Sequence, residues 1–342
     1  MIQDFTIAYG DYDKNPGNYY LPENSPLKAA IYLALKLGKP LLITGDPGTG
    51  KTQLAYWAAW FLSNHADSNL QNFISDPFVF HTKTTSVSRE LFYHYDAISH
   101  FQDKEGKKDV SVFIGLSAMG QAICQTSGSR ALLAKYELNG IKNIDALREA
   151  PCSSVLLIDE IDKAPRDFTN DLLDEIENNR FYITEIDKTI YRSDDRKCRI
   201  LVILTSNNEN NLPDAFLRRC LFYNVPFPSD DELMKIIVNR ISPFLQEVIQ
   251  NSAVDFTVRY AKALQLFRLV KEKAVVKQPS TSELLDWIKV LHLENLLDSN
   301  VDITNFVSLD EMQKRSLLLS LYTLIKTRQD LEQIETLLKL TN

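Results

Sequence analysis

The chain has 342 residues, of which 44% are hydrophobic and 24% are charged, so its composition is that of an ordinary soluble protein and its length allows two packed domains. The formal net charge of −7 argues against nonspecific binding to nucleic acid, without excluding a local basic patch. No apolar run reaches the roughly 18 to 20 residues of a membrane helix, and no basic segment followed by an apolar core opens the chain, so we expect a cytoplasmic protein without a signal peptide.

The first predicted elements surround a glycine-rich segment. Residues 24–37 repeat apolar positions at helical spacing, and Gly38 is suited to end that helix. A short apolar run at 40–44 leads into residues 45–52, and residues 53–65, rich in alanine and leucine, predict a second helix. Three of the 11 glycines in the chain lie within residues 45–52, so this clustering is itself a signal.

The next region predicts a strand, a helix and an insertion. Residues 78–85 are typical of a strand, and residues 88–98 predict the start of a helix with Ser88 as its N-terminal cap. Residues 101–115 are polar and then β-prone, which predicts a hairpin inserted into or beside a helix.

Two buried strands follow, each ending in polar residues. Residues 153–162 predict a strand that ends in acids, and residues 167–179 predict a helix. Residues 180–199 predict a β-hairpin, and residues 198–208 predict another buried strand. Strands that alternate with helices in this way indicate a parallel α/β sheet covered on both faces.

The pattern changes after residues 226–233. From there to residue 342 the chain contains no glycine, and apolar residues repeat at helical spacing. We therefore predict an α/β domain at 1–227 and an all-helical domain at 228–342.

The four cysteines do not form a recognisable site. They contain no CxxC pair and have no histidines at metal-ligand spacing, which predicts reduced thiols rather than a metal site or a disulfide framework. These residues are Cys124, Cys152, Cys198 and Cys220.

Residues 45–52 match the phosphate-binding pattern G-x-x-x-x-G-K-[ST], between a predicted strand and a predicted helix. Glycines let successive backbone N–H groups point at phosphate oxygens at the start of the helix. Lys51 adds a mobile positive charge, and the Thr52 hydroxyl is placed to bind Mg²⁺. The alternative is a glycine-rich turn without a ligand, which the flanking elements disfavour. The predicted nucleotide-binding residues are Gly45, Asp46, Pro47, Gly48, Thr49, Gly50, Lys51, Thr52 and Gln53.

A pair of acids ends the strand at 155–158. The carboxyl ends of strands in α/β sheets are where ligands bind, so we predict that Asp159 holds Mg²⁺ through water. Glu160 is predicted to orient and polarise the attacking water in nucleotide hydrolysis. The alternative is that the acids stabilise the N-terminus of a helix.

Polar residues also end the strand at 200–204. The motif Thr205-Ser206-Asn207-Asn208 could place a side chain on the γ-phosphate or the attacking water, and Asn207 is our candidate. An asparagine-rich turn without a catalytic role is the alternative.

In this order, the three motifs resemble those of the AAA+ ATPases, and within them the MoxR branch. GDPGTGKT matches Walker A, LLIDEID matches Walker B and TSN matches sensor 1, and flanking segments extend the similarity over nearly the whole chain. The resemblance implies a three-layer P-loop NTPase domain with a parallel sheet, followed by an all-helical lid. Residues 101–117 would correspond to the helix-2 insert and residues 180–199 to the pre-sensor-1 hairpin.

The resemblance also implies an arginine finger at the end of LPDAFLRRC. By position this is Arg219, with Arg218 as the second candidate. Such a finger reaches the γ-phosphate of the neighbouring subunit, where its planar, permanently charged group stabilises the transition state. The alternative is that both arginines form surface ion pairs, each worth about 0 to 1 kcal/mol.

The chain departs from the family at the sensor 2 arginine, because Ser282 occupies the corresponding position. The sequence Ser280-x-x-Glu283 is a good capping box, so we expect the helix itself to be present. The departure puts in doubt that the lid senses nucleotide directly.

The resemblance implies a homo-oligomeric ring, a hexamer, that hydrolyses ATP with Mg²⁺ and remodels a partner protein, often beside a protein with a von Willebrand factor A domain. One alternative is a motor stimulated by nucleic acid, which DNA- or RNA-stimulated hydrolysis would favour. Another is a slow nucleotide-gated switch in a bacterial defence or regulatory complex, for which the missing sensor 2 arginine leaves room.

Overall fold

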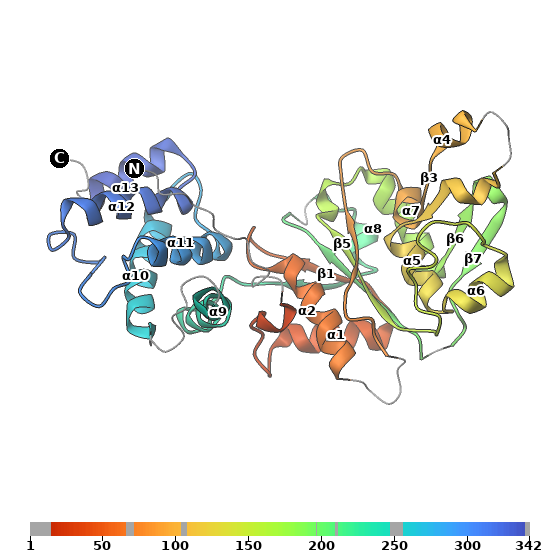
Figure 1. The fold of residues 1–342 in the computed structure, drawn as a ribbon, viewed down its shortest axis with the longest axis horizontal. Coiled ribbons are helices and arrows are strands. Elements are labelled where there is room, and N and C mark those ends of the chain that lie inside the picture. The colour runs from red at the N-terminus through yellow and green to blue at the C-terminus, as the bar shows by residue number, and fades with distance from the viewer. Residues whose placement is uncertain are drawn as a thin grey trace. The chain divides into compact units, whose positions relative to one another are not determined.

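The computed structural model describes residues 15–65, 72–103, 108–195, 197–208, 211–246 and 256–338. Their elements divide into two compact units (Figure 1): an α/β unit made of 21–45 and 51–225, and a helical unit made of 46–50, 226–342 and the described part of 1–20. The predicted domain limits at 227 and 228 stay a prediction, as does everything inferred from the first 14 residues, which lie outside the described part.

The α/β unit is built on a five-stranded sheet with the strand order β2-β5-β8-β1-β9, in which every neighbouring pair is parallel. Two small antiparallel pairs, β3 with β4 and β6 with β7, lie outside this sheet. The strands are β1 (Leu41–Thr44), β2 (Phe78–His81), β3 (Tyr93–Tyr95), β4 (Ile114–Leu116), β5 (Ser154–Asp159), β6 (Arg180–Ile183), β7 (Lys188–Tyr191), β8 (Ile200–Thr205) and β9 (Leu221–Asn224).

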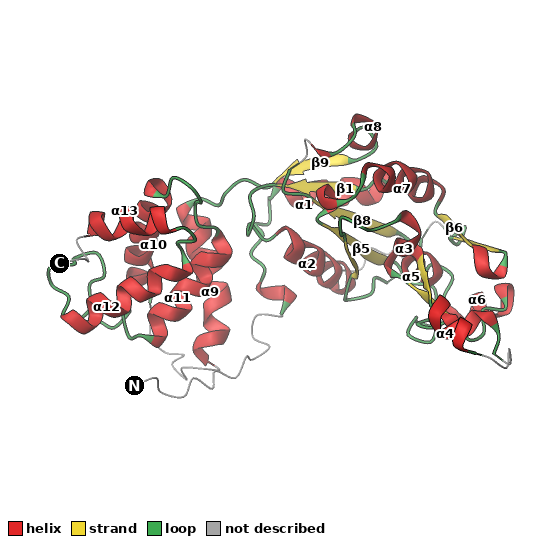
Figure 2. Cartoon of the chain, turned by 90° about the horizontal axis from the view of Figure 1, so that it is seen from above, coloured by secondary structure: helices red, strands yellow, loops and turns green. Residues whose placement is uncertain are grey.

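Helices cover both faces of the parallel sheet, as Figures 1 and 2 show. Alternate residues of β5 and β8, such as Leu156 and Leu204, pack in one core with residues of α5 and α7, while α1 and α2 contact the sheet elsewhere. This arrangement confirms the predicted three-layer α/β architecture. The helices of the unit are α1 (Pro26–Leu37), α2 (Lys51–Asn64), α3 (Ser88–Phe92), α4 (Ala97–Gln102), α5 (Ala118–Gln125), α6 (Ser129–Tyr136), α7 (Arg166–Asn178) and α8 (Asp214–Leu217).

Helix α1 ends where its sequence predicts. The Ser25 hydroxyl accepts a hydrogen bond from the Leu27 N–H, and Pro26 occupies the first turn, where its missing N–H costs nothing. Gly38 ends the helix with a φ of 64°, a left-handed conformation that glycine adopts without strain.

The region after β2 differs from its prediction. Helix α3 has five residues and begins at Ser88, so Ser88 is the first helical residue and not the cap. The chain leaves the helix at Tyr93 because the backbone there pairs with Leu116 across β3 and β4. The predicted insert therefore begins earlier, at β3, and it contains α4; residues 104–107 of the insert lie outside the described part.

The helical unit confirms the predicted change of class, because the described residues from 226 onward contain helices and no strand. Its core surrounds the fully buried side chain of Trp287. The capping box predicted at Ser280 and Glu283 is present at the start of α11. The helices are α9 (Asp230–Phe244), α10 (Thr257–Lys273), α11 (Thr281–Leu293), α12 (Glu311–Ser320) and α13 (Arg328–Leu338).

A buried histidine is expected to make the helical unit less stable in acid. The Nε2 atom of His292 lies 2.9 Å from the Tyr260 hydroxyl, and burial, together with the charge of Arg259, lowers the pKa of His292 from 6.5 to about 4. A lowered pKa means that the folded state disfavours protonation of His292. The contribution of this residue to the free energy of unfolding is therefore fully present above pH 6.5 and is lost as the pH falls toward 4. The loss should approach about 3 kcal/mol.

Urea unfolding followed by the fluorescence of Trp287, in a Trp57→Phe/Trp60→Phe background, measures this loss. We expect the free energy of unfolding to fall between pH 6.5 and 4, and to fall less in His292→Gln, which has no titrating ring. An equal fall in both proteins would contradict this assignment.

None of the described helices combines the length and the apolar composition that crossing a bilayer requires.

Candidate nucleotide-binding site

The loop between β1 and α2 has the backbone of an anion-binding turn. Gly45, Gly48 and Gly50 all have positive φ angles, of 140°, 73° and 85°, which side chains rarely allow. The Thr49 hydroxyl donates to the Asp46 carbonyl at 2.8 Å, which tightens the turn. Lys51 begins α2, so the loop leads its N–H groups into a helix N-terminus, where anions are favoured.

The side chains of the loop differ in their burial. Lys51 is buried, and its Nζ donates to the Gly45 carbonyl at 2.7 Å, so the ammonium lies folded over the loop. Thr49 is also buried. Thr52 is half-buried, and the side chains of Asp46, Pro47 and Gln53 are exposed.

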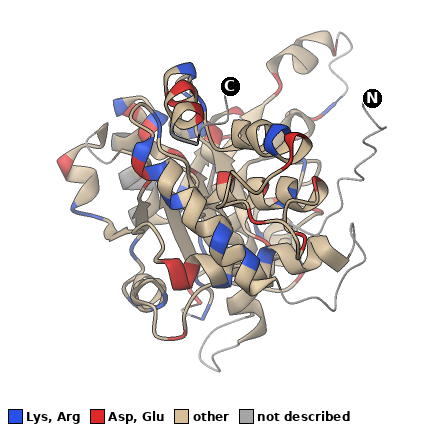
Figure 3. Cartoon of the chain, turned by 90° about the vertical axis from the view of Figure 1, so that its left-hand side faces the viewer, with Lys and Arg blue, Asp and Glu red and all other residues tan. Residues whose placement is uncertain are grey.

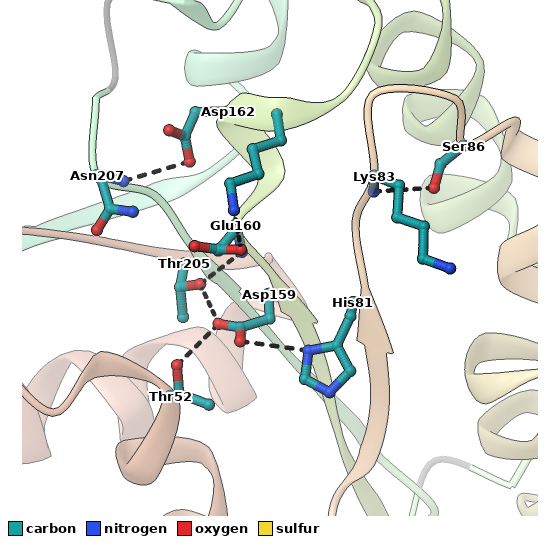
Figure 4. A network of polar contacts seen from close by, with 10 residues as sticks. Thr52, His81, Lys83, Ser86, Asp159, Glu160, Asp162, Thr205 and Asn207 are labelled. Atoms are coloured by element: carbon teal, nitrogen blue, oxygen red, sulfur yellow. Dashed lines mark hydrogen bonds and ion pairs between the residues drawn. The ribbon is translucent and has the colours of Figure 1, made fainter. Parts of the chain in front are cut away.

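Asp159 is the centre of the polar network drawn in Figure 4. It ends β5, is 8% exposed, and its Oδ1 accepts hydrogen bonds from the Thr52 hydroxyl at 2.9 Å and the Thr205 hydroxyl at 2.6 Å. The structure therefore brings together Thr52 and Asp159, the two predicted metal-binding residues. A hydroxyl and a carboxylate are the oxygen donors that Mg²⁺ prefers, so this donor set fits the ion.

Thr205 connects both acids, a role that the sequence analysis missed. While its hydroxyl donates to Asp159, the same oxygen accepts a hydrogen bond from the Glu160 N–H at 2.8 Å. The signal was available, because Thr205 ends the strand next to the one that carries the acids. The sequence could not show that its hydroxyl, rather than Asn207, makes the contact.

His81 is a second residue that the sequence analysis missed. It ends β2 beside Asp159 in the parallel register of β2 and β5. Its Nδ1 lies 3.5 Å from Oδ2 of Asp159, the oxygen that the threonines leave open. The ring itself is largely exposed.

Glu160 follows Asp159 in an unusual conformation. Its φ of 57° is left-handed, which is uncommon outside glycine. Its carboxylate forms an ion pair with Lys163, with 2.5 Å between Oε2 and Nζ. The hydrogen bond to Glu160 raises the pKa of Lys163, and the charges of Glu160, Asp162 and Asp159 act in the same direction.

Asn207 lies at the same edge of the sheet, just beyond β8 (Figure 4). Its backbone N–H donates to the Asp162 carboxylate at 3.3 Å, and its side chain is exposed. The structure thus gathers Lys51, Thr52, Asp159, Glu160 and Asn207 at the carboxyl ends of β1, β5 and β8.

Arg218 and Arg219 lie at the other end of the sheet. Both are exposed, and only Cys220 separates Arg219 from β9, which runs parallel to β1 with Leu221 opposite Leu41 and Asn224 opposite Thr44. The phosphate-binding loop follows Thr44, so strands of four residues, about 13 Å long, separate the two ends. Arg219 donates from Nη1 to the Ala215 carbonyl at 3.2 Å. The fold therefore does not bring the arginines to the loop of their own chain.

A five-stranded parallel sheet with a glycine-rich loop after β1 and paired acids at the end of β5 defines a P-loop nucleoside triphosphatase of the AAA+ type. Residues 40–220, more than half of the chain, match the model of the AAA domain (dynein-related subfamily), and the chain belongs to this family. This finding confirms the resemblance to AAA+ ATPases, whereas the MoxR branch stays a prediction.

Among solved structures, the chain is similar to NtrX from Brucella abortus in complex with ATP, at 13% sequence identity and a TM-score of 0.46. The match covers 95% of this chain and 71% of that one. A comparison with curated proteins gave no match.

Proposed function

We propose that this protein binds ATP together with Mg²⁺ and hydrolyses it to ADP and phosphate. The observation that carries the proposal is the carboxylate of Asp159, hydrogen-bonded to Thr52 in the first turn after the phosphate-binding loop and to Thr205. An acid with a purely structural role would not need a hydrogen bond from Thr52, which lies in the first turn after this loop. Its neighbour Glu160 supplies a second carboxylate at the same edge.

Each residue of the site has a part in this reaction. The backbone N–H groups of 45–52 and the ammonium of Lys51 would hold the β- and γ-phosphates. Thr52 and, through water, Asp159 would hold Mg²⁺, which when bound neutralises charge on the phosphate oxygens. Glu160 would orient the attacking water, and Asn207 would contact that water or the γ-phosphate.

We further propose that the chain works as a homo-oligomeric ring, a hexamer, in which Arg219 completes the site of the neighbouring subunit. The supporting observation is the position of Arg218 and Arg219 at the opposite end of β9 from the loop of their own chain. An arginine that lies away from the loop of its own chain is suited to act at the site of a neighbouring subunit.

The biological output that we propose is remodelling of a partner protein in the cytoplasm, as in the MoxR-like ATPases, with an α/β domain at 1–227 and a helical lid at 228–342. The partner would be the remodelled protein or one with a von Willebrand factor A domain. We favour protein over nucleic acid because the net charge is −7. Figure 3 shows both acidic and basic positions on this side, with several basic ones in a row along one helix in front.

Removal of the metal tests the proposed chemistry. Phosphate release from ATP should be measurable with Mg²⁺, fall to background when EDTA is added, and return when Mg²⁺ is restored in excess, because the lysine alone does not replace the charge that Mg²⁺ neutralises on the phosphate oxygens. Phosphate release that persists in EDTA would contradict a Mg²⁺-dependent ATPase.

A further inference from the structure

The turn that carries Glu160 is fixed at both ends. The Glu160 N–H donates to Thr205, and the Glu160 carbonyl accepts from the Lys163 N–H at 3.0 Å, which closes the short helix η4 (Ile161–Lys163). With its backbone set in this way, the Glu160 side chain can change direction only by rotating about its own bonds.

In the structure the Glu160 side chain is engaged by its own turn. Lys163 is three residues further on, and its Nζ lies 2.5 Å from Oε2 of Glu160. The charges of Asp159 and Asp162 also act on Lys163. A carboxylate oxygen that accepts from an ammonium at this distance is a poor acceptor for a water proton, because the ammonium already satisfies and polarises it.

The pair is also exposed enough to open. The Lys163 and Glu160 side chains are 49% and 41% exposed, so water competes with the contact and its strength is that of a surface ion pair. A divalent cation bound at Asp159 would compete with Lys163 for the same acids.

We propose that Lys163 is a positioning residue that restrains Glu160, that bound nucleotide and Mg²⁺ weaken this restraint, and that part of it persists in the nucleotide-bound state. The inference rests on the proposed function, because it assigns a resting state to the residue that orients water. Lys163 thereby lowers basal hydrolysis without contacting nucleotide.

Steady-state kinetics of Lys163→Met test the restraint. We expect kcat to rise about two- to fivefold with KM for ATP unchanged, in keeping with the modest strength of exposed ion pairs. Lys163→Arg keeps the charge and should restore the wild-type kcat, and Lys36→Met, on the exposed face of α1, is the matched control. Adding Lys163→Met to Glu160→Gln should give no increase, because the restrained group is then absent. An unchanged or lower kcat in folded Lys163→Met overturns the proposal.

A second measurement does not depend on turnover. The rate at which acetic anhydride modifies Lys163, relative to Lys36, should rise in Glu160→Ala and should rise in the wild type when ATP and Mg²⁺ are added. Equal rates in wild type and Glu160→Ala overturn the restraint. A wild type that never hydrolyses ATP contradicts the proposed function instead, so the two failures are distinguishable.

Discussion

Glu160→Gln is expected to bind ATP with nearly the wild-type affinity and to lose about 10²-fold or more of its turnover. The amide has the shape of the carboxylate, and the hydrogen bond from the backbone N–H of residue 160 to Thr205 does not depend on the side chain. The substitution should therefore leave the phosphate-binding loop undisturbed, whereas the group proposed to orient water can no longer accept a proton. Phosphate release and binding of a fluorescent ATP analogue measure the two properties separately.

The matched control is Glu137→Gln. Glu137 is also a glutamate in the left-handed conformation, with a φ of 53°, but it ends α6 and its side chain is 85% exposed. The Glu137→Gln variant should hydrolyse ATP at the wild-type rate. If Glu160→Gln kept its turnover, the assignment of Glu160 would be wrong. If Glu160→Gln bound no ATP, the substitution would have disturbed the phosphate-binding loop, and the loss of turnover would not report on the role of Glu160.

The same variant serves to find the partner. A protein that binds ATP but does not hydrolyse it should hold its substrate longer, so co-purification of Glu160→Gln with ATP should retain a protein that wild type releases. Retention of nucleic acid instead would favour the motor over the remodelling factor.

Arg219→Ala is expected to leave ATP binding by the isolated subunit intact and to lower hydrolysis by about 10³-fold, the effect of arginine fingers in other nucleoside triphosphatases. The physical reason is the position of the residue before β9, at the opposite end of the strand from the loop of its own chain. Hydrolysis measured as a function of protein concentration reports the contribution of the neighbour. Arg218→Ala is the matched control, since Arg218 is adjacent and equally exposed, and its loss should be smaller.

Mixing distinguishes a finger that acts across an interface from one that acts within the chain. Arg219→Ala subunits keep their phosphate-binding loop, and Lys51→Ala subunits keep their arginine. A mixture should regain activity that neither has alone, because a Lys51→Ala subunit supplies its arginine to the intact loop of its neighbour. Absence of rescue in mixed oligomers would count against action in trans.

The sequence predicted those parts of the site that local geometry and strand order control. A loop with glycines at 45, 48 and 50 has few conformations open to it, and it must connect β1 to α2. Since the carboxyl ends of parallel strands share one edge, residues after β1 and β5 had to come close. Thr52 and Asp159 therefore meet as expected, with 2.9 Å between their oxygens.

Contacts that depend on side-chain direction were beyond prediction. That Thr205 rather than Asn207 bonds to Asp159 depends on the register of β5 and β8, which hydrophobic runs do not reveal. The early end of α3 depends on pairing of Tyr93 with Leu116, residues far apart in the chain. Local propensity favoured a longer helix there, and the long-range pairing decided against it.

The sequence by itself therefore determined the class of the protein, the glycine-rich loop proposed to receive phosphates and the acids beside it, because each follows from a short run of residues and a strand end. Only the tertiary structure decided how those acids are held. It placed Lys163 on Glu160, Thr205 and His81 on Asp159, and the two arginines at the far end of β9. The reason is physical: such contacts depend on the positions of atoms brought together by packing and strand register, which no local pattern specifies.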